Sequence, residues 1–217
     1  MAKADALWSQ RADLQKLKEA MALYEEILGK DPTNVESLWK LARAYWWLGT
    51  HSPEAEKEAI LEKGIDYGKR AVSLKDDCAP CHYWLGVNYG VYGEKKGVLK
   101  SLSLVDLIKE EMNKVIALDP GFMNGGAYRI LGRMAHKLPW FAGGSNKDSV
   151  EYLKKALEYG PNSFLTRVFL AETYLAMGEK ELARKELEWC LSAPEPKDPG
   201  DREDREKARK LYRENFQ

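Results

Sequence analysis

The sequence has few of the features that mark disulfide-rich, membrane-spanning or strongly charged proteins. Its 217 residues include three cysteines, Cys78, Cys81 and Cys190, which are too few for a disulfide-stapled fold. No apolar run approaches the roughly 20 residues that a membrane-spanning helix needs. Lys plus Arg and Asp plus Glu each number 34, so the formal net charge is zero. A neutral total argues against nucleic-acid binding and against a polybasic membrane-surface protein.

The common catalytic motifs are also missing from the sequence. It contains no G-x-x-x-x-G-K-[ST] phosphate loop, no H-E-x-x-H metal motif and no G-x-S-x-G nucleophile motif. Acidic pairs such as Glu25-Glu26 and Glu110-Glu111 are typical of solvated helix faces. We therefore expect a protein that is not an enzyme and that holds no metal or cofactor.

A helix-ending signal recurs along the chain at intervals close to a tetratricopeptide (TPR) repeat. Proline cannot continue a helix and disfavours helical geometry in the residue before it. The signals end at Pro32, Asp76, Pro120, Pro161 and Pro194, which are 44, 44, 41 and 33 residues apart. Since a TPR repeat has about 34 residues, the first three intervals carry extra residues. We expect these insertions in the connections between paired helices.

The first helix of each predicted pair carries the other half of the TPR pattern. A leucine is followed by a small residue, which lets the two helices of a repeat approach closely. In three copies a tyrosine and then a glycine follow, and the glycine suits the left-handed conformation that ends a helix. The four copies begin at Leu41, Leu85, Leu131 and Leu170.

These periodicities predict an all-α fold, a right-handed superhelix of about five TPR-like helix pairs with insertions and a C-terminal capping helix. We assign residues 1–200 to the helical repeat domain and residues 201–217 to the capping helix. The predicted pairs span residues 5–30, 34–76, 78–120, 122–161 and 163–193.

The first helices of a TPR array line its inner face, where residues one helical turn apart share a side. The second pair has an aromatic stripe there and the fourth a basic one. An arginine fork suits a carboxylate, so the two stripes could together hold a carboxylate with an apolar body. Alternatively, the charges are a solvated face and the tryptophans are core residues. The apolar insertions at 94–107 and 138–145 either make contacts or extend the core. The candidate ligand- or partner-binding residues are Trp39, Arg43, Trp46, Trp47, Tyr83, Arg129, Arg133, His136, Lys137, Leu138, Trp140 and Phe141.

The segment from Cys78 to His82 matches the C-x-x-C-H attachment motif of c-type haem. Haem would require His82 as an axial ligand, yet the motif opens a TPR helix, where haem would compete with repeat packing. A Cys78–Cys81 disulfide is a second interpretation. We favour a third, two small residues near a helix N-terminus, and keep a haem or thiol redox protein as an alternative function.

Several segments carry a more specific signal than the TPR pattern, and together they resemble one family. They resemble the T component of the TPR-associated tripartite ATP-independent periplasmic (TRAP) transporters, over roughly residues 35–193. The segments are 82–90, 97–102, 128–133, 138–140, 143–147, 156–157 and 169–172.

The resemblance implies a non-catalytic periplasmic scaffold that associates with an extracytoplasmic substrate-binding protein in the uptake of small organic acids. It also implies that the chain could form homo-oligomers and bind a small hydrophobic carboxylate itself. The first six residues lack a signal peptide, so a leader would be absent from this sequence; a cytoplasmic protein is the alternative. The alternative function is a generic TPR adaptor that binds a peptide or protein partner in its concave groove.

Overall fold

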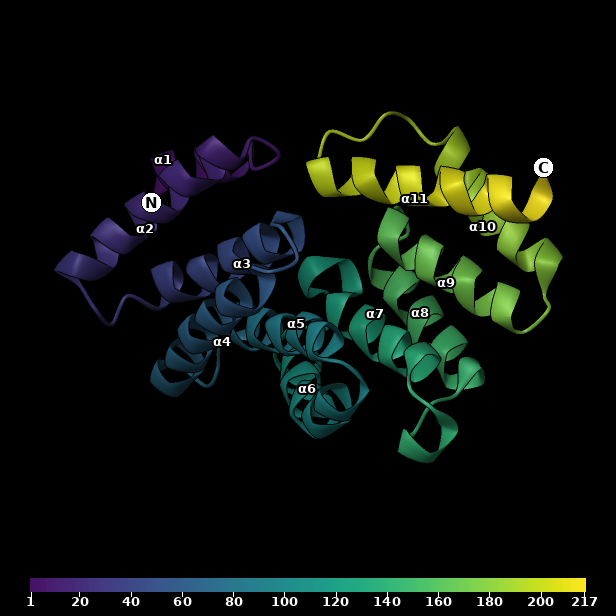
Figure 1. The fold of residues 1–217 in the computed structure, drawn as a ribbon, viewed down its shortest axis with the longest axis horizontal. Helices are drawn as coiled ribbons and strands as arrows, with labels where there is room; N and C mark the ends of the chain where they lie inside the picture. Colours follow the sequence, from purple (N-terminus) through teal and green to yellow (C-terminus); the bar gives the residue numbers. More distant parts are fainter. The chain divides into compact units, whose positions relative to one another are not determined.

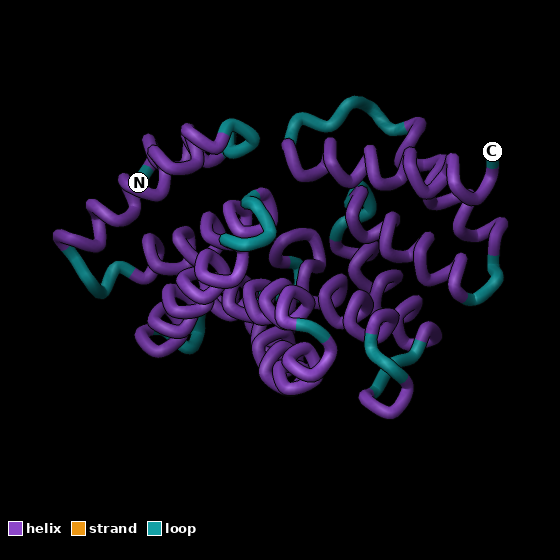
Figure 2. The backbone as a smooth tube through the Cα atoms, viewed as in Figure 1, coloured by secondary structure: helices purple, strands orange, loops and turns teal.

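The structure, a computed structural model, consists of paired helices, as the repeat signals predict. It describes residues 1–217 with the exception of the side chain of Val98. Within the described chain there are eleven α-helices, one 3-10 helix (η1) and no β-strand (Figures 1 and 2). The predicted all-α TPR-like fold class is thus confirmed. The chain divides into two compact units, Met1–Asp119 (unit 1) and Pro120–Gln217 (unit 2).

Unit 1 contains three pairs of helices in which each helix packs on the next one in the chain. Side-chain caps explain where several of them begin. The Asp13 carboxylate accepts from the backbone N–H groups of Gln15 and Lys16, and the Asn34 side chain accepts from Ser37 N–H. The helices are α1 (Ala2–Trp8), α2 (Leu14–Lys30), α3 (Val35–His51), α4 (Lys57–Leu74), α5 (Ala79–Lys96) and α6 (Val98–Leu118).

A buried amide and a small residue fix the packing of α3, α4 and α5. Asn88 is fully buried, and its Nδ2 donates to the carbonyl oxygens of Ala42 at 3.0 Å and Trp84 at 2.7 Å. A Cβ on Gly64 would lie 2.3 Å from Asn88 Oδ1. Glycine at position 64 therefore lets α4 approach the amide that joins α5 to α3.

The extra residues of the long repeats lengthen helices in unit 1, so the expected position of these insertions was wrong. Only Gly97, with φ +90°, separates α5 from α6, and these helices have 18 and 21 residues. Leu104 and Val105 are buried, whereas Leu99 is 86% exposed. The 94–107 insertion therefore mainly extends the helical core, because its apolar residues recur with helical spacing.

Unit 2 contains two helix pairs and a final helix, α11, that packs on α9 and α10. Leu211, Tyr212 and Phe216 of α11 pack against the core formed by Leu170, Leu187 and their neighbours. The elements are α7 (Phe122–Lys137), η1 (Trp140–Ala142), α8 (Asn146–Tyr159), α9 (Phe164–Ala176), α10 (Lys180–Ser192) and α11 (Pro199–Phe216).

Helix α7 opens with a left-handed turn that no sequence pattern indicated. Met123, Asn124 and Gly125 have φ values of 52°, 57° and 71°. A Cβ on Gly125 would lie 2.7 Å from Ala156 O, and one on Gly160 would lie 2.4 Å from Asn124 Cβ. The two glycines therefore allow this turn to lie directly against the end of α8.

Candidate functional site

Five of the partly exposed residues of α3 lie about one helical turn apart and form a single face. Spacings of four, four, three and four residues correspond to one side of an α-helix. Trp47 is only 2% exposed, so the structure places Trp46 rather than Trp47 on this face. We call Trp39, Arg43 and Trp46 the α3 stripe. The full face comprises Val35, Trp39, Arg43, Trp46 and Thr50.

The guanidinium of Arg43 lies among aromatic rings at the centre of the α3 stripe. Its Cζ is 3.9 Å from the ring centroid of Trp8 and 5.2 Å from that of Trp39. Its Nη2 donates to the hydroxyl of Tyr24 at 3.5 Å, and its buried Nε has no hydrogen-bond partner among the described residues. Burial lowers the pKa of Arg43 to about 10, so the group remains cationic at neutral pH.

The stacking continues past Trp8 into the core of unit 1. The guanidinium of Arg11 is 4.7 Å from the ring centroid of Trp8 and 4.4 Å from that of Trp47. The indole N–H of Trp47 donates to the carbonyl oxygen of Arg11 at 3.1 Å, and His51 stacks on the other side of Trp47. Each cation–π contact contributes about 0.5–2 kcal/mol. Together they fix the short loop between α1 and α2 against α3.

Lys40, the next cation along α3, is neutralised by carboxylates. Its Nζ lies 2.8 Å from Asp5 Oδ2 and 2.6 Å from Glu36 Oε1. Burial alone would raise the pKa of Asp5, but hydrogen bonds from Lys40 and Tyr24 outweigh it, and the pKa is lowered. Arg43, in contrast, has no carboxylate within ion-pair distance among the described residues. The Asp5 carboxylate acts on Arg43 through its charge but forms no ion-pair contact with it, so the guanidinium can still accept a carboxylate in direct contact.

Aromatic packing links the α3 stripe to α5. The ring centroids of Trp46 and Trp84 are 5.2 Å apart, and those of Tyr83 and Trp84 are 5.0 Å apart. Tyr83 and Trp84 are each 3% exposed. The candidate residue Tyr83 thus lies in the packed interior, where it supports the α3 stripe through Trp84.

The basic candidates of α7 lie in unit 2 and have partners there. Arg133 forms an ion pair with Glu172 and its Cζ is 4.2 Å from the ring centroid of Phe169. Arg129 is 6% exposed and donates to Met123 O at 3.3 Å. His136 Nδ1 lies 2.9 Å from Asn146 Oδ1. Helix α7 belongs to unit 2 and the α3 stripe to unit 1. A site that combines them therefore stays a prediction.

The remaining candidates lie at the connection between α7 and α8. Lys137 is exposed and Leu138 partly exposed. Trp140 and Phe141, both on η1, are 84% and 67% exposed. This insertion therefore protrudes from unit 2 instead of extending its core.

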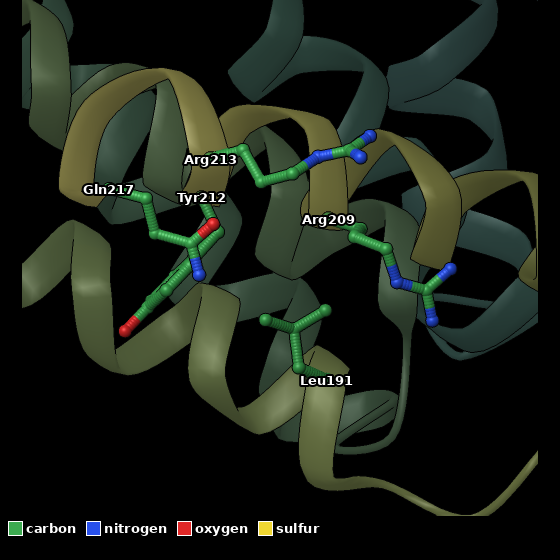
Figure 3. A pocket seen from close by; sticks show the side chains of 5 residues that line it. All are labelled: Leu191, Arg209, Tyr212, Arg213 and Gln217. Carbon is green, nitrogen blue, oxygen red and sulfur yellow. The ribbon is translucent and has the colours of Figure 1, made fainter.

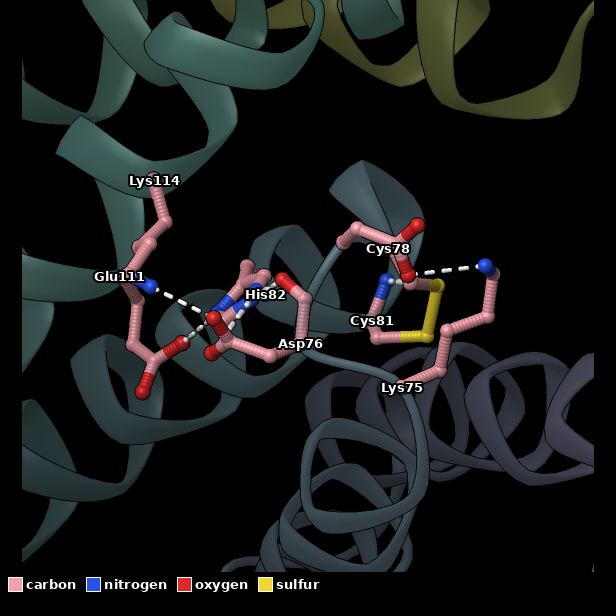
Figure 4. Close-up of polar contacts among 8 residues, drawn as sticks. Lys75, Asp76, Cys78, Cys81, His82, Glu111 and Lys114 are labelled. Carbon is pink, nitrogen blue, oxygen red and sulfur yellow. Dashed lines mark hydrogen bonds and ion pairs between the residues drawn. A yellow bond between two sulfur atoms is a disulfide. The ribbon is translucent and has the colours of Figure 1, made fainter.

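The C-x-x-C-H segment forms a disulfide and a buried ion pair (Figure 4). Cys78 and Cys81 are bonded, so the unbonded pair that we favoured from the sequence was wrong. His82 Nδ1 lies 2.6 Å from Glu111 Oε2, and Nε2 lies 2.7 Å from the carbonyl oxygen of Asp76. Both partners offer acceptor oxygens, so both ring nitrogens can donate when the imidazole is protonated. Burial alone would lower the His82 pKa, but these bonds outweigh it and raise the pKa. The two sulfur atoms are bonded to each other, and both ring nitrogens of His82 have hydrogen-bond partners. The segment is therefore not arranged to hold haem.

Unit 2 has a shallow pocket of about 360 Å³ (Figure 3). No pattern in the sequence predicted it. Arg209 and Arg213 of α11 are four residues apart and border it. Arg209 forms an ion pair with Glu206, and Tyr212 Oη donates to Glu188 at 3.1 Å. The lining residues are Leu191, Arg209, Tyr212, Arg213 and Gln217.

The described residues form neither a metal-binding cluster nor a membrane-spanning helix. Among them, no group of three or more His, Cys, Asp or Glu side chains is placed to hold a metal ion. No helix in the same part of the chain has the length and apolar character required to cross a membrane.

The chain is similar to a family of regulators of microtubule dynamics. The model of the family described as "RMD1-3: Regulator of microtubule dynamics protein 1-3" matches residues 1–141. Regulator of microtubule dynamics protein 1 of Mus musculus is 25% identical over 201 residues, covering 84% of this chain and 65% of the relative. Protein 3 of Xenopus laevis is 27% identical over 209 residues, covering 88% and 44%. The chain thus spans less than two thirds of the length of these relatives.

Two solved structures have a similar fold, and one of them is a TPR protein. The thermophilic TPR protein TTC0263 of Thermus thermophilus has a TM-score of 0.69 and 20% identity, covering 93% of this chain and 95% of that one. The type IV pilus biogenesis factor PilW has a TM-score of 0.64 and 19% identity, covering 99% and 92%. At such identities the likeness shows the fold alone.

These findings correct two expectations that came from the TRAP resemblance. The TPR-like repeats are confirmed, but the assignment to the TRAP T component was wrong, because another family's model matches most of the chain. The periplasmic location was also wrong, since the curated relatives are regulators of microtubule dynamics from vertebrates, whose cells have no periplasm. The chain belongs to the regulator of microtubule dynamics protein 1–3 family.

Proposed function

We propose that the chain is a non-catalytic TPR adaptor that binds an acidic segment of a protein partner along the α3 stripe. The observation that carries the proposal is Arg43, a cation held between Trp8 and Trp39 with no carboxylate within ion-pair distance among the described residues. A carboxylate is the natural complement of a guanidinium fork. The partly exposed rings of Trp39 and Trp46 on either side suit an apolar side chain next to that carboxylate.

The partner that we propose is tubulin or another protein of microtubules. Family membership supports this choice, because the relatives are named regulators of microtubule dynamics. It supports an adaptor better than the uptake of organic acids, for which the family gives no support. A small hydrophobic carboxylate would use the same arginine, so competition by free carboxylates is a useful additional measurement.

Co-sedimentation with polymerised tubulin tests the proposal. We expect Arg43→Gln and Trp46→Ala to weaken binding roughly tenfold or more, the effect of losing a charged hydrogen bond or a buried aromatic anchor. Lys63→Gln, which removes an exposed cation from α4, is the matched control and should bind like the unmodified chain. Thermal unfolding of each variant separates lost binding from lost folding. Equal binding by the Arg43 and Lys63 variants, or no binding by the unmodified chain, would contradict the proposal.

A further inference from the structure

An exposed aromatic pair in unit 2 has no part in the α3 stripe. Trp140 is 84% exposed and Phe141 is 67% exposed, and their rings meet edge to face with centroids 5.9 Å apart. Both residues belong to η1, in the connection between α7 and α8 that Figure 1 shows. Large apolar side chains that are exposed next to each other often mark a contact surface, whereas single exposed ones are common.

Hydrogen bonds within the backbone hold the loop that carries the pair. The N–H groups of Ala142 and Gly144 donate to the carbonyl oxygen of Pro139, and Ser145 N–H donates to Ala135 O at 2.7 Å. Glycine is required at position 144, because a Cβ there would lie 1.8 Å from Leu138 O. Backbone hydrogen bonds and a glycine therefore define the conformation of this exposed loop.

The sequence on both sides of the aromatic pair is basic, although the chain as a whole is neutral. Residues 120–147 contain no Asp or Glu and four Lys or Arg residues. Arg129 and Arg133 have partners inside unit 2, whereas Lys137 and Lys147 are exposed and flank the loop. The first acidic residue beyond the loop is Asp148. Two exposed lysines therefore border the loop, and the exposed Asp148 directly follows the second of them.

We propose that the loop at 138–145 anchors unit 2 to an anionic lipid bilayer. Trp140 and Phe141 would enter the headgroup region, where aromatic side chains are favoured. Lys137 and Lys147 would lie among the lipid phosphates, because cations near an anionic leaflet are attracted to it. An exposed aromatic pair flanked by exposed lysines suits the surface of an anionic bilayer. The contact is peripheral, and it stands independently of the α3 stripe.

Vesicle flotation tests the anchor. The full chain is mixed with vesicles of phosphatidylcholine alone or of phosphatidylcholine with phosphatidylserine, at low and at raised salt. We expect binding to the anionic vesicles, weakened by salt. Trp140→Ala with Phe141→Ala should lower the affinity roughly tenfold or more. Lys137→Gln with Lys147→Gln should remove the preference for phosphatidylserine.

Leu99→Ala is the matched control, because Leu99 is an equally exposed apolar residue in unit 1; this variant should bind like the unmodified chain. Circular dichroism should show that all variants are folded, since the altered side chains are exposed. Absence of binding to anionic vesicles, or equal binding by the Trp140/Phe141 variant, would overturn the proposal. So would a sedimentation-velocity dimer that this variant loses in the absence of vesicle binding, because the pair would then join two copies of the chain.

Discussion

The imidazole Nδ1 of His82 lies 2.6 Å from Glu111 Oε2 and joins the first turn of α5 to α6. The other ring nitrogen lies 2.7 Å from the carbonyl oxygen of Asp76, ahead of α5. A single buried imidazolium therefore ties together the chain before α5, α5 itself and α6. The same first turn is held from the other side by the Cys78–Cys81 disulfide.

This ion pair predicts a loss of stability as the pH rises. The pKa of His82 in the folded chain is raised above its ordinary value of 6.5. The stabilisation is therefore complete below pH 6.5 and is lost as the pH rises through the folded pKa. The free energy of unfolding should fall in that window by at most about 1.4 kcal/mol per pH unit. Urea denaturation across the window measures the slope.

The variant His82→Gln is the control for this pH dependence. It should lower stability at pH 6 and flatten the slope, because glutamine does not titrate. A slope that persists in the variant would assign the effect to other groups, and a rise in stability over the same window would contradict the ion pair.

The three cysteines should differ in their reaction with alkylating reagents. Burial raises the pKa of Cys190 to about 12, so its thiol stays protonated and unreactive in the folded chain. Mass spectrometry should show no alkyl group on the native chain. It should show one on the unfolded chain without reductant, and three after unfolding and reduction, as expected from one free and two bonded cysteines. Three groups without reductant would exclude the disulfide.

Alanine at position 125 should destabilise unit 2. Gly125 has φ +71°, and its added Cβ would lie 2.7 Å from Ala156 O and 2.8 Å from Ala156 Cα. Left-handed backbone and a backbone clash together should lower the free energy of unfolding by about 2–4 kcal/mol. Gly29→Ala is the control, because a Cβ there meets nothing within 4 Å in a helix, where alanine stabilises by up to about 1 kcal/mol. Similar effects for the two variants would contradict the left-handed turn.

A double-mutant cycle should detect the stacking of Arg43 on Trp8. The cycle compares Trp8→Leu, Arg43→Gln and the double variant by chemical denaturation. The 3.9 Å contact predicts a coupling of about 0.5–2 kcal/mol. The pair Trp8→Leu with Lys63→Gln serves as the control and should show additive effects. Additivity for Trp8 and Arg43 as well would mean that the contact does not stabilise the chain.

The sequence allowed the helix pairs and part of the α3 stripe to be predicted, because both depend on local spacing. Prolines such as Pro32 and Pro161 do mark helix ends, and Trp39 and Arg43 do share a face of α3. The contribution of Trp8 and Arg11 was missed. They lie on a short helix and a loop without the TPR pattern, and their contacts with α3 span more than thirty residues of chain.

The insertions and the family were harder to predict, for a physical reason. Extra residues with helical spacing can either lengthen a helix or leave the helix and form a loop. The position of Gly97 alone does not decide between these two outcomes. The inserted segments that suggested a TRAP component are short and lie within repeats whose pattern is set by helix packing. Many TPR families share that pattern, so a resemblance within it indicates the fold more reliably than the partner.

Hydrogen–deuterium exchange of the chain with and without tubulin tests the adaptor proposal most directly. With tubulin bound, exchange should slow in peptides from α3 (Val35–His51) and α1 (Ala2–Trp8). Exchange in α10 (Lys180–Ser192) should not change, so this helix serves as an internal reference. The slowing should be absent in Arg43→Gln. Protection confined to unit 2, with α3 unchanged on binding, would contradict the assignment of the α3 stripe as the partner-binding surface.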